Sequence, residues 1–228
     1  MTELWEGIAR AFVLILSLDR EVMEITGRSL TISMTSCGVA VLICLPLSSV
    51  IHFNRFPGKR YLISLIQTSF SLPTVAIGLF VFVIFSRAGP LGILGLMFTP
   101  SIMVIGQAIL ITPVMLGLTI SALSGGDIAI SETARALGAT KFQTMVITIR
   151  EVRYAVITAV VMGFGRAISE VGLSLIVGGN IKGYTRTITT AISLETSRGD
   201  IELSMALGII LTMIAFLINL VLNRIQQK

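Results

Sequence analysis

The chain contains 228 residues, of which 54% are hydrophobic and only 13% are charged. Soluble domains carry roughly 25% charged residues, so this composition excludes an ordinary soluble protein and indicates a polytopic membrane protein. The net charge of +5 does not indicate nucleic-acid binding, because the chain has one Trp, three Tyr and no basic stripe that alternates with aromatic residues.

Long apolar runs predict the fold class. A transmembrane helix needs about 20 largely apolar residues. The runs that meet this requirement cover approximately residues 29–50, 61–86, 101–121, 154–177 and 203–222. We therefore expect an all-α membrane protein, a bundle of about five transmembrane helices.

The segment before the first run is shorter. Residues 4–18 are apolar but include Glu6 and Arg10, a pattern typical of an amphipathic helix in the membrane interface. Two alternatives stay open, a cleaved signal peptide and a sixth, short span. We expect an N-terminal segment over residues 1–24, a membrane domain over 25–222 and a tail over 223–228.

Residues with catalytic or metal-binding chemistry are sparse. Cys37 and Cys44 lie seven residues apart in the first apolar run, which favours packed thiols over a disulfide or a metal site. His52 follows that run in a basic loop. No Gly-x-x-x-x-Gly-Lys-Ser/Thr pattern occurs. We expect no metal site, no catalytic residue and no cofactor bound by this chain.

The second run is unusually polar for a membrane span. Its candidate pathway-lining residues are Gln67, Ser69, Ser71, Pro73 and Thr74. Proline within a helix leaves a backbone carbonyl without its N–H donor, and neighbouring groups or water must satisfy it. We expect Pro73 to interrupt the second run and Pro113 to interrupt the third. The pattern favours a lining of the translocation pathway, and the alternative is a face that hydrogen-bonds to another helix.

Between the third and fourth runs, the sequence predicts a capped helical hairpin. Asp127 suits the N-cap of a helix over residues 128–137, and Gly138 suits the left-handed position after its end. Thr140 and Gln143 match a capping box that starts a second helix.

The first of these helices has features of a docking element. Glu132 and Arg135 lie three residues apart and can pair weakly. Ala134 is small enough to admit a close partner. Leu137 and Phe142 offer apolar anchors on either side of the turn. An ordinary connector between spans is the alternative.

The fourth run contains charges at membrane depth. Arg166 and Glu170 are spaced i, i+4, so a continuous helix would let them neutralise each other, with Ser169 beside them. A charged residue at the bilayer centre costs at least about 2.5–3.5 kcal/mol on insertion scales. Two interpretations stay open: a structural ion pair at a contact between two copies, or a border of the translocation pathway.

The outer end of the fourth run carries Gly178, Gly179 and Asn180. Paired glycines favour helix termination, and backbone N–H groups at such a turn are able to face an anion instead. The hydroxyl-rich stretch 185–192 follows and includes Arg186. We expect these four residues in the outer vestibule, or in contact with an external protein.

The distribution of Lys and Arg predicts the orientation. Three regions are basic and should share the cytoplasmic side. They contain Arg55, Lys59 and Arg60; Arg135, Lys141, Arg150 and Arg153; and Arg224 and Lys228. The N-terminus is then outside the cell, the C-terminus is cytoplasmic, and the hairpin is accessible from the cytoplasm.

Two motifs carry a family resemblance. The pattern Glu132-x-Ala134-x-x-x-Gly138 resembles the cytoplasmic coupling motif of type I ABC importer permeases. The run Gly163–Gly172, with residues 177–181 and 189–196, resembles the oxyanion permeases and most of all the tungstate permease subfamily. This chain departs from the family at Arg150-Glu151, where a Leu-Pro pair usually stands, so we expect the helix to continue there.

The resemblance implies a permease domain over residues 25–222 in a prokaryotic cell membrane. It implies a second copy of the chain, a cytoplasmic dimer of ATPase subunits that uses ATP and Mg²⁺, and an extracytoplasmic oxyanion-binding protein. Molybdate, sulfate or another small solute are alternative substrates. A channel or a secondary transporter is a more distant alternative, since no inverted repeat is evident.

Overall fold

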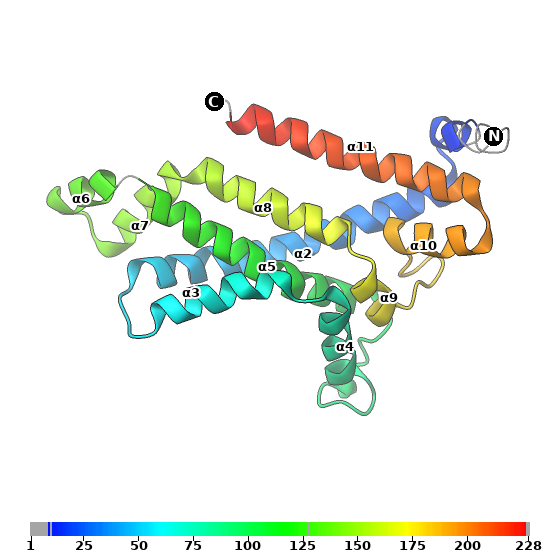
Figure 1. Cartoon of the computed structure of the whole chain (residues 1–228), viewed down its shortest axis with the longest axis horizontal. Helices are drawn as coiled ribbons and strands as arrows, with labels where there is room; N and C mark the ends of the chain where they lie inside the picture. Colours follow the sequence, from blue (N-terminus) through cyan, green and yellow to red (C-terminus); the bar gives the residue numbers. More distant parts are fainter. Residues whose placement is uncertain (1–8, 10, 127, 227–228) are drawn as a thin grey trace.

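The computed structural model describes residue 9, residues 11–126 and residues 128–226. Every regular element within these residues is helical, which confirms the all-α class, and the long helices lie side by side (Figure 1). The elements are α2 (Arg20–Phe53), α3 (Lys59–Thr68), η1 (Ser69–Ser71), α4 (Thr74–Phe85), η2 (Gly92–Leu94), α5 (Pro100–Gly125), α6 (Ile128–Ala136), α7 (Lys141–Glu151), α8 (Arg153–Ile168), α9 (Gly172–Gly178), α10 (Ile188–Arg198) and α11 (Ile201–Gln226).

Five candidate spans are present if each bent helix pair counts as one span. Helices α2, α5 and α11 are long and apolar enough to cross a membrane unbroken. The second span is bent by 100° between η1 and α4, and the fourth is bent by 60° between α8 and α9. The predicted number of spans is confirmed, and the second span breaks at Pro73, the proline singled out in the sequence. The break between α8 and α9 in the fourth span was not predicted.

The two prolines singled out in the sequence behave differently. Leu72 and Pro73 adopt extended backbone angles, with ψ near 130°, and α4 then leaves the bundle at a steep angle (Figure 1). Pro113, in contrast, lies inside an unbroken α5, so the predicted interruption of the third span is wrong. Helix α5 packs against both α2 and α8, and these contacts stabilise it despite the proline.

The main core surrounds α5. Its buried side chains include Ile102, Met103 and Ile111, and Leu173 of α9 packs against them. The hydroxyl of Ser36 in α2 donates to Oε1 of Gln107 in α5 at 3.1 Å, so these two buried polar side chains pair across the core.

A second apolar cluster joins the N-terminal part of α2 to α10 and α11. Its buried members are Val22, Ile25, Ile188, Ala191 and Leu207, with Leu14 packed against them. The carboxylate of Asp19 accepts from the backbone N–H groups of Glu21 and Val22 and starts α2 at Arg20, inside the segment predicted to end at residue 24. Residues 11–16 are helical, and most of the earlier part of the predicted amphipathic helix lies outside the described residues.

Candidate functional site

The predicted hairpin begins with α6, which ends at a glycine turn. Gly138 has φ +84°, in the left-handed region that favours glycine. Its N–H donates to the carbonyl of Arg135 at 3.0 Å, and the N–H of Ala139 donates to the carbonyl of Ala134 at 2.9 Å. This pair of bonds is a Schellman motif, which confirms the predicted role of Gly138.

A capping box starts the second helix of the hairpin. The N–H of Thr140 donates to Oε1 of Gln143 at 2.8 Å, and the N–H of Gln143 donates to Oγ1 of Thr140 at 3.3 Å. The predicted box is thereby confirmed. Asp127, the predicted N-cap of α6, lies outside the described residues.

The tip of the hairpin exposes large apolar side chains. Leu137 is 83% exposed and Phe142 is 69% exposed. Glu132 and Arg135 are exposed too, but no ion pair joins them in the described part of the chain. Ala134 is only 8% exposed, so it faces the interior of the hairpin rather than a partner. The exposed apolar surface of the hairpin tip is therefore formed by Leu137 and Phe142, with Glu132 and Arg135 nearby.

The hairpin continues into the fourth span almost without interruption. Helix α7 ends at Glu151, so the expectation that the helix continues past Arg150-Glu151 is wrong. Only Val152 separates it from α8, with φ −89° and ψ 16°. A single residue thus connects the hairpin to the membrane helix.

The two broken spans meet at their breaks. A Cβ atom built on Gly172, the first residue of α9, would lie 2.7 Å from Cγ2 of Val75 and 3.5 Å from Oγ1 of Thr74, at the start of α4. A Cβ atom on Gly78 would lie 2.9 Å from Cα of Leu173. Helices α4 and α9 therefore start side by side, with their backbones in close contact.

The charges beside this junction do not form the predicted ion pair. Helix α8 ends at Ile168, and the buried carboxylate of Glu170 accepts from the N–H of Leu173 at 2.9 Å, capping the first turn of α9. Arg166 forms no ion pair with any described residue, and its buried Nε has no hydrogen-bond partner. Ser169 is exposed on the same turn and donates to the carbonyl of Arg166. The i, i+4 pairing was wrong because the helix breaks between the two residues.

The polar residues of the second span form one uncovered face. Ser64, Gln67, Thr68 and Ser71 recur at helical spacing on α3 and η1, and all four are exposed. Pro73 is exposed as well, while Ser69 and Thr74 are half-buried. Since polar side chains are costly against lipid, this face needs water or another protein surface beside it.

The outer glycines terminate α9 as predicted. Gly179 has φ +71° and Asn180 has φ +50°. Gly178 is buried, and a Cβ atom there would lie 2.7 Å from Sδ of Met103. The side-chain amide of Asn180 donates to the carbonyl of Thr190 at 3.2 Å. These residues hold the end of α9 against its neighbours.

Arg186 is a buried structural residue, which corrects its placement in the outer vestibule. It is 5% exposed and pairs with Glu195 at 3.1 Å and with Glu21 at 3.7 Å. Its carbonyl accepts from Nη1 of Arg28. Sequence reasoning missed this network because Glu21 and Arg186 are far apart in the chain, and no local pattern links them.

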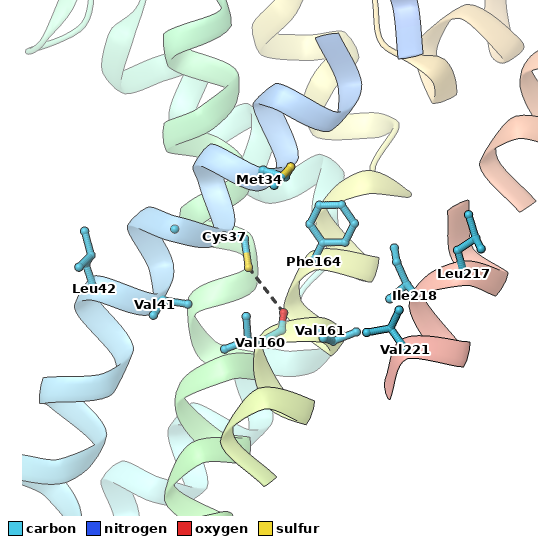
Figure 2. A pocket seen from close by; sticks show the side chains of 11 residues that line it. Met34, Cys37, Val41, Leu42, Val160, Val161, Phe164, Leu217, Ile218 and Val221 are labelled. Atoms are coloured by element: carbon cyan, nitrogen blue, oxygen red, sulfur yellow. Dashed lines mark hydrogen bonds between the residues drawn. The ribbon is translucent and has the colours of Figure 1, made fainter. Parts of the chain in front are cut away.

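A large apolar groove lies between α2, α8 and α11 (Figure 2). Its volume is about 760 Å³, and its lining is almost entirely aliphatic and aromatic. The thiol of Cys37 is directed at the carbonyl of Val160 at 3.5 Å, so the groove offers no free polar group from that side. This lining is unsuited to an anion, which excludes the groove as a pathway for one.

The fold and these surfaces define a class of membrane transport subunit. The structure resembles a chain of the inward-facing MetNI methionine ABC transporter with a TM-score of 0.72 and 18% sequence identity, covering 93% of this chain and 95% of that one. The chain belongs to the family of binding-protein-dependent transport system inner membrane components, whose model matches residues 33–228.

Two relatives differ in the solute they carry. The chain is 40% identical to the tungstate uptake system permease protein TupB of Peptoclostridium acidaminophilum, over 98% of both chains. It is 29% identical to the molybdenum transport system permease protein ModB of Escherichia coli K12, over 88% of this chain and 95% of that protein. The chain is therefore an ABC importer permease subunit with relatives among oxyanion transporters.

Proposed function

We propose that this chain is the permease subunit of an ATP-driven tungstate importer. The proposal that the substrate is tungstate rests on the near full-length similarity to a tungstate permease. The sequence identity to that permease, 40%, exceeds the 29% identity to a molybdenum permease. Tungstate, molybdate and sulfate are all tetrahedral dianions, so the charge of the chain alone does not separate them.

The proposed assembly contains two copies of this chain, two cytoplasmic ATPase subunits and an extracytoplasmic oxyanion-binding protein. The ATPase subunits would hold ATP and Mg²⁺, and this chain would contribute no ATPase site. The exposed tip of the hairpin supports this assignment, because Leu137 and Phe142 offer apolar anchors for a cleft in another subunit. Glu132, Arg135 and the Gly138 turn would complete the docking surface.

The proposed translocation pathway follows the polar face of the second span and the junction of the two breaks. It comprises Gln67, Ser69, Ser71, Pro73 and Thr74, with Arg166, Ser169 and Glu170 of the fourth span. The unpaired guanidinium of Arg166 supports this proposal, because a cation without a partner is costly in lipid but is stabilised by water or a passing anion. Two copies would present two such cations to a dianion.

The experiment that tests this function measures ATP-dependent uptake of tungstate by elemental mass spectrometry, with molybdate and sulfate as competitors. The chain is coexpressed with the candidate ATPase and binding protein of the same importer. We expect uptake that needs all three components and prefers tungstate. Uptake that prefers another anion would reject the substrate, and uptake without the ATPase would favour a channel or secondary transporter.

The coupling role has a separate test. Glu132→Arg reverses a charge on the docking surface and should abolish copurification of the ATPase. The control is Glu151→Arg, because Glu151 is also exposed but lies at the far end of α7. Equal ATPase recovery with Glu132→Arg and the wild-type chain would contradict the coupling role.

A further inference from the structure

A cleft of about 810 Å³ lies where the end of α2 meets the hairpin, and it shares Arg135 and Phe142 with the proposed docking surface. Four cationic side chains and one imidazole line it. They are Arg55, Lys59, Arg135, Lys141 and His52. No carboxylate lines the cleft among the described residues. Such a concentration of one charge is costly unless an anion balances it.

Part of the cleft wall is rigidly held. Nζ of Lys59 donates to the carbonyl of His52 at 2.6 Å and to that of Asn54 at 3.3 Å, which fixes the ammonium group at the C-terminal end of α2. The ring of His52 lies within hydrogen-bond distance of the Ser124 hydroxyl of α5, at 3.4 Å. The geometry of this wall does not depend on a ligand.

Three other cations of the cleft have no partner among the described residues. Arg55, Arg135 and Lys141 form no ion pair or side-chain hydrogen bond with any of the residues that the structure describes. They come from the loop after α2, from α6 and from α7, so an anion between them would join three elements. Guanidinium and ammonium groups arranged in this way suit a phosphate.

The position and the remaining lining favour a lipid as the source of that phosphate. The cleft lies at the end of α2, a candidate membrane span, where lipid headgroups are found. Val50, Phe53, Phe142 and Met145 line it as well and offer apolar contacts for the start of an acyl chain. Basic pockets between helices at the membrane surface are suited to anionic headgroups.

We propose that this cleft binds the phosphate of an anionic phospholipid and that the bound lipid links the hairpin to the end of α2. The shared chemistry is a tetrahedral oxyanion, and a free phosphate could supply it too. The proposal does not depend on which solute is transported.

The test is native mass spectrometry of the full-length chain in detergent, titrated with phosphatidylglycerol or phosphatidylcholine. The wild-type chain should retain phosphatidylglycerol preferentially. Arg55→Gln combined with Lys141→Gln should weaken this binding about 30-fold, the factor expected when two basic residues no longer contact anionic lipid. Arg150→Gln is the matched control, because Arg150 is exposed on α7 but does not line the cleft.

Four outcomes would overturn the proposal. The first is equal retention of the two lipids, and the second is an equal loss of binding in the Arg150→Gln control. The third is displacement of the lipid by inorganic phosphate at similar concentration, which would assign the cleft to a free anion. The fourth is a double variant that keeps the lipid but loses the ATPase in the copurification described above, which would assign the cleft to protein docking.

Discussion

Arg186 and Arg166 show two ways in which this chain holds an arginine away from bulk water. Arg186 is surrounded by carboxylates of its own chain, with Glu195 at 3.1 Å and Glu21 at 3.7 Å. Arg166 has no such partner among the described residues. The first arrangement stabilises the fold, whereas the second leaves a charge that must be balanced from outside the chain.

Replacing Glu195 by Gln should destabilise the chain, because Arg186 loses its nearest buried carboxylate. We expect a loss of about 3 kcal/mol, the lower end for a broken buried pair, since Glu21 remains. Thermal unfolding of the purified chain in detergent measures this loss. Glu24→Gln is the control, because Glu24 pairs with Arg20 at an exposed site and should leave the unfolding temperature unchanged. Equal effects of the two substitutions would contradict the buried network.

Glu170 and Arg166 should act independently. Glu170→Ala removes the side-chain cap of α9 and should cost about 1 kcal/mol of stability. If the two residues do not interact, the effects of Glu170→Ala and Arg166→Gln add to within about 0.5 kcal/mol in a double-mutant cycle. The same unfolding assay gives the stability loss of each variant. A larger coupling energy would indicate that Arg166 and Glu170 do form the ion pair that the sequence suggested.

The residues predicted correctly from sequence are those whose partners are local. Gly138, Thr140 and Gln143 interact within three or four positions, so their roles follow from short motifs. The partners of Arg186 come from α2 and α10, and this tertiary arrangement has no local signature.

At the scale of elements, the hairpin depends on a backbone conformation that few residues adopt. Gly138→Ala forces a side chain into the left-handed region at a cost of about 1–2 kcal/mol and should reduce recovery of the ATPase in copurification. Gly138→Asn is the control, since Asn tolerates this region better. A Cβ atom at this position would meet nothing within 4 Å, so a steric clash is not an alternative cause. Full recovery with Ala would show that the turn conformation is not needed for docking.

The contact between α4 and α9 has its own test. Gly78→Ala would bring a methyl group to 2.9 Å from Cα of Leu173, so the backbones must separate, and overpacking of this kind typically costs about 1–3 kcal/mol. Gly38→Ala is the matched control, because Gly38 is also in mid-helix but has open space around it. Proteolysis of the chain in detergent should be faster for Gly78→Ala than for Gly38→Ala. Equal rates would mean that the two helices do not need this close approach.

The elements themselves were predictable in number but not in shape. Apolar length identifies five candidate spans, and a proline marks the break at Pro73. Pro113 carries the same local signal inside an unbroken helix, because packing against α2 and α8 outweighs it. The break before Gly172 contains no proline, and the Glu170 cap that starts α9 is visible only once the chain is folded.

At the scale of the whole molecule, the charge distribution predicts which side of the membrane each end occupies. Leu137→Cys should react with a membrane-impermeant maleimide only after permeabilisation of spheroplasts, and Tyr184→Cys should react without it. Both residues are exposed; Leu137 directly follows α6 and Tyr184 belongs to the loop between α9 and α10, and these elements lie at opposite ends of the bundle (Figure 1). Cys37 and Cys44 are buried and serve as an internal background. Labelling of Leu137→Cys in intact spheroplasts would reverse the orientation.

The single residue between α7 and α8 has a mechanical consequence. Helix α8 contains 16 residues, so it extends about 24 Å as one stiff rod from Val152 to the junction of the broken spans. A tilt of the hairpin is either absorbed by rotation about Val152 or carried along this rod as a lever. The stiffness of the backbone at Val152 thus decides how much of a movement of the hairpin, outside the membrane, is transmitted by α8 to the centre of the membrane.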